Sequence, residues 1–270
     1  MDVKDSFLLD NKVAIVTGAC GLLGRQHCRA LAEAGASVVV ADLDGAASKE
    51  FAAELGKQHL GVDLDVTDKE SLNNTLQMVL RRYERVDVLV NNAAINDMFE
   101  NPLLAAEQSM FENYPFQLWQ RSLDVNISGI FLCSQVFGSV MAEQNSGSII
   151  NIASTYGVVA PDQSIYINER GEQDFFKSPS YPVTKSAVIG FTKYLAAYWG
   201  HRNVRVNALS PGGVENSQQP FFVQNYARKT LLNRMAKPGD YKAAIVFLAS
   251  DASLYMTGAN LIIDGGWTAI

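Results

Sequence analysis

Residues Val13–Gly24 read VAIVTGACGLLG, a short apolar and β-branched run that passes directly into a glycine-rich turn. From Leu22 onward the apolar residues have helical spacing, so this turn joins a first strand to a first helix. Glycines there allow a tight turn and a close approach to a pyrophosphate, which the free N–H groups and the dipole of a helix N-terminus stabilise. We therefore expect the turn to bind a dinucleotide through Gly18, Gly21, Leu22, Leu23 and Gly24.

The second predicted strand, Ser37–Ala41, is followed by an acidic residue, Asp42. A carboxylate at this place can accept hydrogen bonds from the adenosine ribose, and it would repel a 2′-phosphate. Neither the glycine turn nor Leu43, which follows the acid, supplies an Arg or Lys to hold such a phosphate. Asp42 and Leu43 are therefore predicted to bind the adenosine of NAD, which is favoured over NADP. In the alternative interpretation Asp42 only caps the next helix, and the two roles are compatible.

Strand-like and helix-like segments alternate along the rest of the chain, as in repeated βαβ units. Helical spacing is clear in Leu22–Ala34 and Ser71–Tyr83. The alternation predicts an α/β fold, a Rossmann-type doubly wound parallel sheet of about seven strands with helices on both faces. Ligands bind such a sheet beyond the carboxyl ends of its strands. The remaining predicted strands are Leu60–Leu64, Val86–Asn91, Gly147–Ala153, Val204–Ser210 and Asn260–Ile263.

The composition favours one soluble domain. The chain has 270 residues, 48% of them hydrophobic, and no linker-like stretch divides it, so we expect a single domain over residues 1–270. A net charge of −6 without a cluster of Lys and Arg argues against nucleic-acid binding. The N-terminus lacks a signal-peptide pattern and no apolar run reaches ~18 residues, which predicts a cytoplasmic protein without a membrane segment. No metal site is expected, because metal-ligand spacing is lacking among Cys20, Cys28, Cys133, His27, His59 and His201.

Two long connections interrupt the alternation, Ile95–Phe116 and Val158–Pro179. Loops of this length are uncommon unless they are functional or disordered, and both follow strand ends on the ligand side of the sheet. We interpret them as insertions that form the walls and lid of a substrate pocket. The alternative is that they are surface insertions without a role in binding.

Five landmarks lie in the order typical of one enzyme family, and they extend over nearly the whole chain. They are Thr17-Gly18 with Gly24, Asn91–Ala94, Tyr181-x-x-x-Lys185, Pro211-Gly212 and Asp264–Gly266. On these motifs the chain resembles the short-chain dehydrogenases/reductases, in particular their compact single-domain branch. The resemblance implies an oxidoreductase that uses a nicotinamide dinucleotide.

The resemblance also implies roles for residues outside the glycine turn. Asn126 occupies the place of the family's active-site Asn, where it would hold a water that links Lys185 to solvent, and Ser154 occupies the place of the catalytic Ser. The implied cofactor residues are Asp65 and Val66 beside the adenine, Asn92, Ala93 and Ala94 beside the central strand, and Pro211, Gly212 and Val214 on the nicotinamide side.

Tyr181 and Lys185 fit the proton transfer that interconversion of an alcohol and a ketone requires. A free Tyr has a pKa of about 10, too high for an efficient base near neutrality. Lys185 shares a helix face with Tyr181, and its charge, together with that of oxidised nicotinamide, is expected to favour the phenolate and lower its pKa. Lys185 should also hold the nicotinamide ribose, and Ser154 should donate a hydrogen bond to the substrate oxygen.

The chain departs from the common family pattern within the glycine turn and after Pro211. Position 22 is Leu where the usual turn has Gly, and Thr17–Gly24 also fits the extended branch of sugar-nucleotide epimerases and dehydratases. The compact length and the Asp-Gly-Gly ending favour the shorter branch. Asn216 stands near the place where the family often has a Thr that binds the nicotinamide carboxamide.

A third departure is the interval of 26 residues between Ser154 and Tyr181, which is longer than the family's usual one. Its polar side chains predict a hydrophilic substrate. They are Asp162, Gln163, Tyr166, Asn168, Glu169, Arg170 and Glu172. The runs Ser154–Asp162 and Pro211–Asn216 are similar to those of dehydrogenases of bacterial flagellin-glycosylation and nonulosonic-acid pathways, which implies a sugar or amino-sugar phosphate.

These observations predict an NAD(H)-dependent oxidoreductase that interconverts a secondary alcohol and a ketone on a small polar, sugar-like molecule. Two alternatives are a 3-oxoacyl-thioester (acyl-carrier-protein) reductase and a dinucleotide-sensing regulator without turnover. Asp42 argues against the first, which usually takes NADP, and Tyr181 with Lys185 argues against the second. Family members are commonly tetramers, and the apolar segment after Tyr181 allows a homo-oligomer, although core packing explains much of the same pattern.

Overall fold

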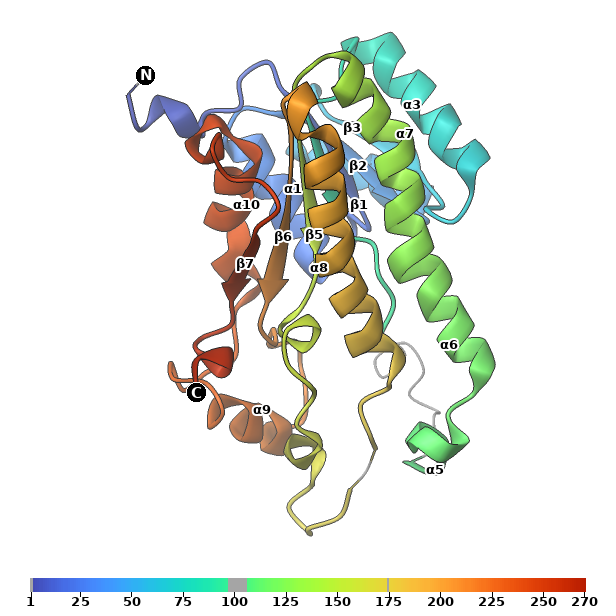
Figure 1. Cartoon of the computed structure of the whole chain (residues 1–270), viewed down its shortest axis with the longest axis vertical. Helices are drawn as coiled ribbons and strands as arrows, with labels where there is room; N and C mark the ends of the chain where they lie inside the picture. The colour runs from blue at the N-terminus through green and yellow to red at the C-terminus, as the bar shows by residue number, and fades with distance from the viewer. Residues whose placement is uncertain (1, 97–105, 174) are drawn as a thin grey trace.

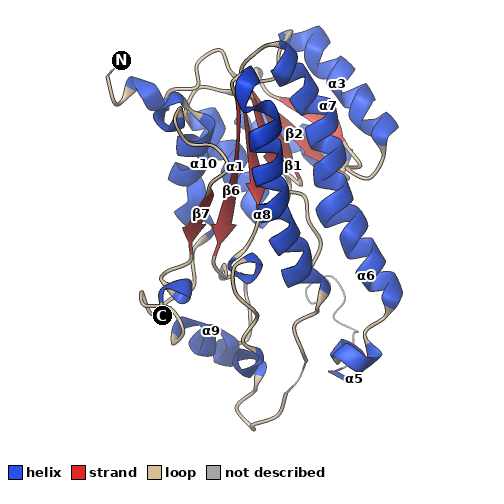
Figure 2. Ribbon diagram, viewed as in Figure 1, coloured by secondary structure: helices blue, strands red, loops and turns tan. Residues whose placement is uncertain are grey.

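The computed structural model describes residues 2–96, 106–173 and 175–270 of the chain. Its centre is one parallel sheet of seven strands in the order β3-β2-β1-β4-β5-β6-β7, which confirms the predicted Rossmann-type sheet (Figures 1 and 2). The strands are β1 (Val13–Thr17), β2 (Ser37–Asp42), β3 (Leu60–Asp63), β4 (Val88–Asn91), β5 (Gly147–Ile152), β6 (Val204–Pro211) and β7 (Asn260–Ile263).

Helices cover both faces of the sheet and also lie beyond its carboxyl edge. Helices α1 and α10 pack against one face, and α3, α7 and α8 pack against the other (Figure 1). Short helices α5 and α9 lie beyond the strand ends. The helices are α1 (Leu22–Glu33), α2 (Gly45–Leu55), α3 (Lys69–Tyr83), α5 (Ala106–Ser109), α6 (Phe116–Leu123), α7 (Ile130–Glu143), α8 (Ser180–Trp199), α9 (Pro220–Ala227) and α10 (Lys242–Ala249).

The first strand shows why the chain forms this sheet. All five residues of β1 are buried, with Ile15 packed in the core of one face and Val16 in the core of the other. A strand covered on both faces needs a continuous apolar run rather than an alternating one. The strand order reverses between β1 and β4, so the connections that follow the two strands lead in opposite directions and leave the crevice in which such sheets bind ligands.

The predicted strands agree with the structure to within two residues at each end. The largest difference is at the fourth strand, which was expected from Val86 but begins at Val88. Asp87 precedes it with a buried side chain that accepts hydrogen bonds from the Val13 backbone N–H and from Arg85. The strand therefore begins later than the apolar pattern predicts, because the Asp87 carboxylate has to face these donors.

Helices α6 and α7 are joined by a π-helical turn, Asp124–Gly129, into one helical segment, Phe116–Glu143. By length and composition this segment could cross a membrane. Half of its most apolar stretch is buried inside the fold, and Phe137 and Met141 pack in the core beneath the sheet. A core helix of a soluble protein has the same properties. Single π turns in α-helices are frequent at functional sites, and Asn126 lies in this one.

The second predicted insertion, Val158–Pro179, is a folded layer rather than an open loop. It contains a 3₁₀ turn, Gln163–Tyr166, and an isolated β-bridge between Ile167 and Gln173. Its aromatic residues pack against α9. Much of the first predicted insertion, Ile95–Phe116, lies outside the described residues; its described part includes α5.

Candidate active site

The glycine turn is shaped so that only glycine fits at its two ends. Gly18 has a φ of +59°, and a Cβ placed there would lie 2.8 Å from the Cα of Ala93. A Cβ on Gly24 would lie 2.2 Å from the carbonyl oxygen of Gly18. The turn is therefore closed tightly onto the start of α1, which leaves backbone N–H groups at a helix N-terminus, the surroundings that suit a pyrophosphate.

The end of β4 holds this turn in place. The side-chain amide of Asn92 donates hydrogen bonds of 2.9 Å to the carbonyl oxygens of both Thr17 and Gly18. In return, the hydroxyl of Thr17 accepts the backbone N–H groups of Asn92 and Ala93 at 3.1 Å. Asn92 and Ala93 thus support the glycine turn from the neighbouring strand, whereas Ala94 is exposed just beyond it.

Asp42 ends β2 beside the glycine turn, and one of its carboxylate oxygens accepts the backbone N–H of Cys20 at 2.9 Å. The alternative role of Asp42 as a helix cap is wrong. Asp44 caps α2, since its carboxylate accepts the N–H groups of Ala46 and Ala47 at 3.1 and 2.9 Å. Asp42 is thus held at the edge of the turn, where a ribose is expected.

The other predicted adenosine residues lie near the same edge in different settings. Leu43 is 70% exposed, as expected of a residue that a ring could cover. The Asp65 carboxylate accepts both the N–H and the hydroxyl of Thr67, and Val66 is buried against Gly129. These contacts stabilise the turn after β3, and the structure leaves the assignment of Asp65 and Val66 to adenine as a prediction.

Tyr181 and Lys185 lie one turn apart at the start of α8, as the sequence predicts. The Lys185 ammonium donates a 2.7 Å hydrogen bond to the carbonyl oxygen of Ile152 at the end of β5 and lies 5.7 Å from the centre of the Tyr181 ring. Burial lowers the pKa of Lys185 to about 8. Ser154, just after β5, lies beside the Tyr181 side chain, where its hydroxyl acts to lower the pKa of the phenol.

The protein's own groups do not produce the expected lowering of the Tyr181 pKa. Burial raises the pKa of this phenol, and the Ser154 hydroxyl opposes the rise only in part. Desolvation of a phenolate is the larger effect here, and Lys185 does not reverse it. Any net lowering would have to come from a further positive charge near the ring.

Asn126 is fully buried in the π-helical turn and fixes the start of the first insertion. Its side chain accepts the N–H of Ile95 at 2.8 Å and donates to the carbonyl oxygen of Ile95 at 3.0 Å. It also donates to the hydroxyl of Thr184, the neighbour of Lys185 in sequence, at 3.2 Å. The contacts connect β4, the π-helical turn and α8, while the water relay implied for Asn126 stays a prediction.

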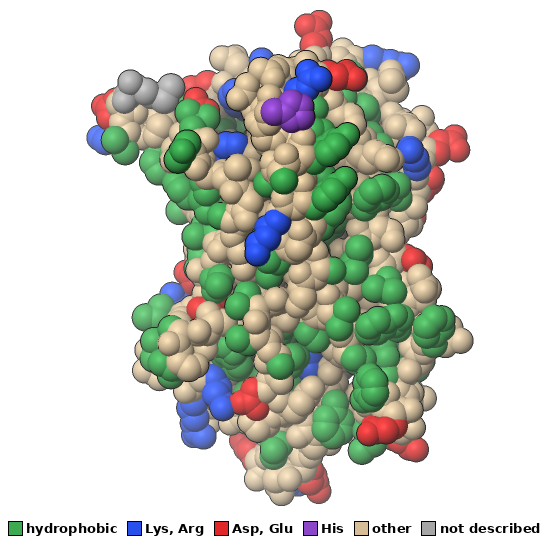
Figure 3. Space-filling model, viewed as in Figure 1, with side chains coloured by type: hydrophobic (Ala, Val, Ile, Leu, Met, Phe, Trp, Pro, Cys, Tyr) green, Lys and Arg blue, Asp and Glu red, His purple; other side chains and the backbone are tan. Residues whose placement is uncertain are grey.

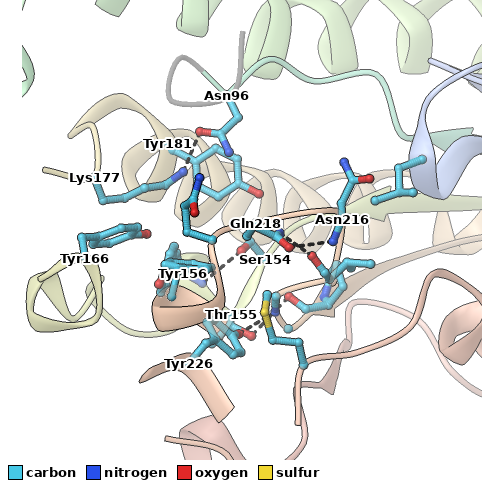
Figure 4. A pocket seen from close by; sticks show the side chains of 18 of the residues that line it. Asn96, Ser154, Thr155, Tyr156, Tyr166, Lys177, Tyr181, Asn216, Gln218 and Tyr226 are labelled. Carbon is cyan, nitrogen blue, oxygen red and sulfur yellow. Dashed lines mark hydrogen bonds between the residues drawn. The ribbon is translucent and has the colours of Figure 1, made fainter. Parts of the chain in front are cut away.

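Ser154 and Tyr181 open into a cavity of about 440 Å³, whose polar residues Figure 4 shows. Five predicted cofactor residues line the same cavity, so the structure brings the catalytic and nicotinamide-side predictions together. They are Leu22, Leu23, Pro211, Gly212 and Val214. Asn216 also lines it, and its backbone N–H donates to Gln218, which fixes the segment after β6.

Sequence reasoning missed the aromatic wall of this cavity. The centre of the Tyr166 ring lies 4.7 Å from that of Phe175, in the same insertion, and 5.3 Å from that of Phe222 of α9. Tyr226 packs beside them and accepts the backbone N–H of Gly213. The adjacent aromatic residues at 221 and 222, shortly after the Pro-Gly landmark, were the available signal.

The expectation that the polar residues of the second insertion line the pocket is wrong for most of them. Of that set, Tyr166 alone is among the cavity-lining residues that the structure describes. Asp162 forms a 2.6 Å ion pair with Lys229, which lowers the pKa of its carboxyl to about 2, and Asn168 binds Glu172. The segment instead contributes Lys177, which lines the cavity but was not predicted.

The chain is similar along nearly its full length to known dehydrogenases. A family model described as enoyl-(acyl carrier protein) reductase matches residues 18–268. D-threitol dehydrogenase of Mycolicibacterium smegmatis is 36% identical, over 99% of this chain and 97% of that protein. Galactitol 2-dehydrogenase (L-tagatose-forming) of Cereibacter sphaeroides is 34% identical over 99% of both chains, and the post-translational flagellin modification protein A of Campylobacter coli is 30% identical over 96% of this chain and 99% of its own.

Solved structures agree with this similarity. A short-chain type dehydrogenase/reductase from Mycobacterium marinum superposes with a TM-score of 0.86 at 31% identity over 100% of both chains. A gluconate 5-dehydrogenase from Burkholderia cenocepacia, in complex with NADP and tartrate, gives 0.85 at 27% identity over 99% of both.

Two further relatives bear on cofactor and substrate. An NAD-dependent glycerol dehydrogenase of Listeria innocua is 31% identical over 97% of this chain and 96% of its own. A 3-oxoacyl-[acyl-carrier-protein] reductase of Thermotoga maritima is 32% identical over 96% of this chain and 98% of its own. Both kinds of nicotinamide dinucleotide therefore occur among the similar proteins.

Proposed function

The chain belongs to the short-chain dehydrogenase/reductase family of oxidoreductases, and we propose that it interconverts a secondary alcohol and a ketone on a small polar, sugar-like substrate with NAD(H). The observation that carries the proposal is the meeting of Tyr181 and Ser154 at one cavity, with Lys185 beside the Tyr181 ring. The cavity is also lined by the segment after β6, which would face the nicotinamide.

The residues present suit a bound dinucleotide. The glycine turn has no room for side chains at Gly18 or Gly24, and Asp42 lies at its edge. Gly18, Gly21, Leu22, Leu23 and Gly24 would hold the pyrophosphate, and Asp42 with Leu43 would hold the adenosine.

Ser154, Tyr181 and Lys185 would then have distinct roles. The nicotinamide, when bound, accepts or donates the hydride at the carbinol carbon. Ser154 would hold the substrate oxygen, and the Tyr181 phenol would take up or supply its proton. Lys185 would bind the nicotinamide ribose and stabilise the Tyr181 phenolate. During oxidation the Tyr181 phenolate would take up the O–H proton, and a bound oxidised nicotinamide would accept the hydride from the carbinol carbon, which leaves a ketone, reduced cofactor and a protonated Tyr.

The preference for NAD rests on Asp42, whose carboxylate would lie where NADP carries its 2′-phosphate. The test is to titrate the protein with NAD and NADP and follow quenching of its Trp fluorescence. We expect NAD to bind at least ten times more tightly, because the phosphate would meet an anion. Tighter binding of NADP would contradict the role of Asp42.

The cavity and the relatives named as polyol dehydrogenases support the proposed substrate class. Aromatic rings such as Tyr166 and Phe222 can pack against the C–H faces of a sugar, while Ser154, Asn96 and Gln218 offer hydrogen bonds. The test is NAD reduction with galactitol, D-threitol and glycerol, with a sugar phosphate and an amino-sugar phosphate as further arms. Turnover of the phosphates alone would favour the nonulosonic-acid interpretation, for which flagellin modification protein A is the supporting relative.

The 3-oxoacyl-thioester reductase alternative keeps some support from the Thermotoga maritima relative. An acetoacetyl thioester with NADH and with NADPH belongs in the same screen. Rapid reduction of that thioester with NADPH, and none of the polyols, would replace the proposal by this alternative. Binding of NAD without turnover of any substrate class would instead favour the non-catalytic regulator.

We also propose that the protein is a homo-oligomer. Side chains on α7 and α8 leave aromatic rings in solvent, with Phe131 47%, Tyr194 61% and Tyr198 58% exposed. Figure 3 shows hydrophobic side chains gathered on the face that these helices present. A contiguous apolar surface of this kind typically marks a protein interface. Light scattering in solution would test the proposal, and a monomer at micromolar concentration would contradict it.

A further inference from the structure

The Tyr156 hydroxyl is a buried polar group in the cavity for which the proposed reaction has no use. Tyr156 is only 9% exposed and lines the cavity together with Ser154 and Tyr181. Its hydroxyl oxygen is shielded from solvent and forms no hydrogen bond of ordinary geometry with the residues that the structure describes. Buried polar groups of native proteins nearly always have a hydrogen-bond partner, so this hydroxyl calls for one.

The short 3₁₀ turn after β5 holds Tyr156 beside the proposed reacting groups. The Tyr156 backbone N–H donates to the Ser154 hydroxyl oxygen at 3.1 Å. Gly157 ends the turn so close to α8 that a Cβ there would lie 2.7 Å from the carbonyl oxygen of Lys185. The Tyr156 ring packs edge-on against Trp267, with ring centres 6.3 Å apart. Because backbone and ring are both held, the hydroxyl has a fixed place in the cavity.

A second phenol, that of Tyr166, lies next to Tyr156. Burial is the main reason why the pKa of Tyr156 is raised far above its usual value, and the neighbouring Tyr166 hydroxyl raises it further. Burial also raises the pKa of Tyr166. In Figure 4 both phenols lie on the side of Ser154 opposite to Asn216. The cavity therefore contains a pair of adjacent hydroxyls that stay neutral near physiological pH.

This pair has more hydrogen-bonding capacity than its two members can use on one another. Each hydroxyl has one hydrogen to donate and two lone pairs, so a bond from one to the other still leaves an O–H hydrogen and several lone pairs. Tyr226, a further phenol of the same wall, differs because its oxygen accepts the Gly213 backbone N–H. The hydroxyls of Tyr156 and Tyr166 thus remain able to bind a ligand.

A neutral hydroxyl is the ligand group that suits this pair best. It can accept a hydrogen from one phenol and donate its own to the other, whereas a hydrocarbon would leave the buried O–H unsatisfied. Besides burial and the neighbouring phenols, the Asp162 carboxylate raises the pKa of Tyr156, so negative charge is disfavoured at this place. The rings of Phe175 and Phe222 lie around Tyr166 and leave the pair as a polar spot in an apolar wall.

We infer that the Tyr156 hydroxyl, together with that of Tyr166, binds a second hydroxyl group of the substrate, on the carbon next to the one that is oxidised or on the carbon after it. The inference rests on the proposed function, since it takes the cavity beside Tyr181 as the substrate site. It makes Tyr156 a specificity-determining residue: the enzyme selects diols and polyols over simple secondary alcohols.

The test compares pentan-2-ol, pentane-2,3-diol and pentane-2,4-diol, which share one carbon chain, in wild type, Tyr156→Phe and Tyr255→Phe. In wild type we expect kcat/KM for one of the diols to exceed that for pentan-2-ol about tenfold or more, and the preferred diol identifies the carbon whose hydroxyl is bound. In Tyr156→Phe this ratio should fall about tenfold, chiefly through KM, because a hydrogen bond to the second hydroxyl is lost. Tyr255→Phe removes the same atom at a fully exposed position and should leave the ratio unchanged.

Equal kcat/KM for the three alcohols in wild type, or an equal loss for all three in Tyr156→Phe, would overturn the inference and leave the proposed reaction standing. Calorimetric titration of the two diols into the NADH-saturated protein provides a readout independent of turnover. Diol binding that Tyr156→Phe weakens, without turnover of any alcohol, would support the inference while contradicting the proposed function.

Discussion

The proposed cofactor side and the proposed substrate side of Tyr181 are built by different means. On the cofactor side, the turn after β1 is made of backbone, and its shape is set by steric limits at Gly18 and Gly24. On the substrate side, a cavity wall is made of side chains from two distant segments, the second insertion and α9. A backbone site admits one shared ligand shape, whereas a side-chain wall can change residue by residue, so substrate specificity is expected to reside in the wall.

The largest expected effect falls on the residue between the two sides. Tyr181→Phe should lower kcat about 1000-fold, because the reaction loses its proton donor and acceptor, while the Kd for NAD changes less than threefold. Steady-state kinetics and Trp fluorescence measure the two quantities. Tyr194→Phe, a change at an exposed position of the same helix, serves as the control. Full turnover in Tyr181→Phe would refute the catalytic assignment.

The next effect tests the cofactor side alone. Gly24→Ala should weaken NAD binding about 100-fold, since the new Cβ would lie 2.2 Å from the Gly18 carbonyl oxygen and force the turn open. Gly239→Ala is the matched control, because nothing lies within 4 Å of a Cβ at that position. Equal NAD affinity in the two variants would show that the turn does not bind the cofactor.

A third effect concerns the pH dependence of stability. Burial lowers the pKa of Lys185 to about 8, whereas an unfolded Lys titrates near ~10.4. Above pH ~8 the unfolded chain therefore binds more protons at this residue than the folded chain, so the free energy of unfolding should rise with pH. Between pH ~8 and ~9.5 the rise should be about 1.5 kcal/mol relative to Lys185→Met. Urea denaturation measures it, and parallel curves for the two proteins would contradict it.

A smaller effect should separate the adenosine end from the rest of the cofactor site. Asp42→Ala should weaken NAD binding about tenfold, through the loss of ribose hydrogen bonds, and should strengthen NADP binding. Fluorescence titration with both cofactors measures the change. Asp44→Ala removes a neighbouring acid that caps α2 and should alter stability more than cofactor choice. Identical cofactor preference in wild type and Asp42→Ala would reject the role of Asp42.

The smallest expected effect lies on the aromatic wall. Phe222→Ala should raise KM for the substrate about fivefold, through lost contact area, and should leave NAD affinity unchanged. Phe111→Ala changes an exposed aromatic residue outside the cavity lining and is the control. A weaker NAD affinity in Phe222→Ala with an unchanged KM for the substrate would contradict the assignment of the aromatic wall to substrate binding alone.

The sequence by itself determined the sheet and the cofactor turn, because their rules are local. A run such as VAIVT buried on both faces, followed by glycines and a helix, allows few structures. Asp42 and the Tyr181–Lys185 spacing were readable for the same reason, since each lies at a fixed distance from a recognisable element.

Tertiary structure decided which side chains line the cavity that we propose binds the substrate. In sequence the second insertion is a polar stretch, and the structure turns Asp162 outward to Lys229 while Tyr166 and Lys177 face inward. The choice depends on partners that are distant in the chain, such as Phe222 for the aromatic wall and Asn96 for Lys177. The pKa of Tyr181 was decided there too, because the cost of burying a charge depends on the whole surrounding volume and not on one Lys four residues away.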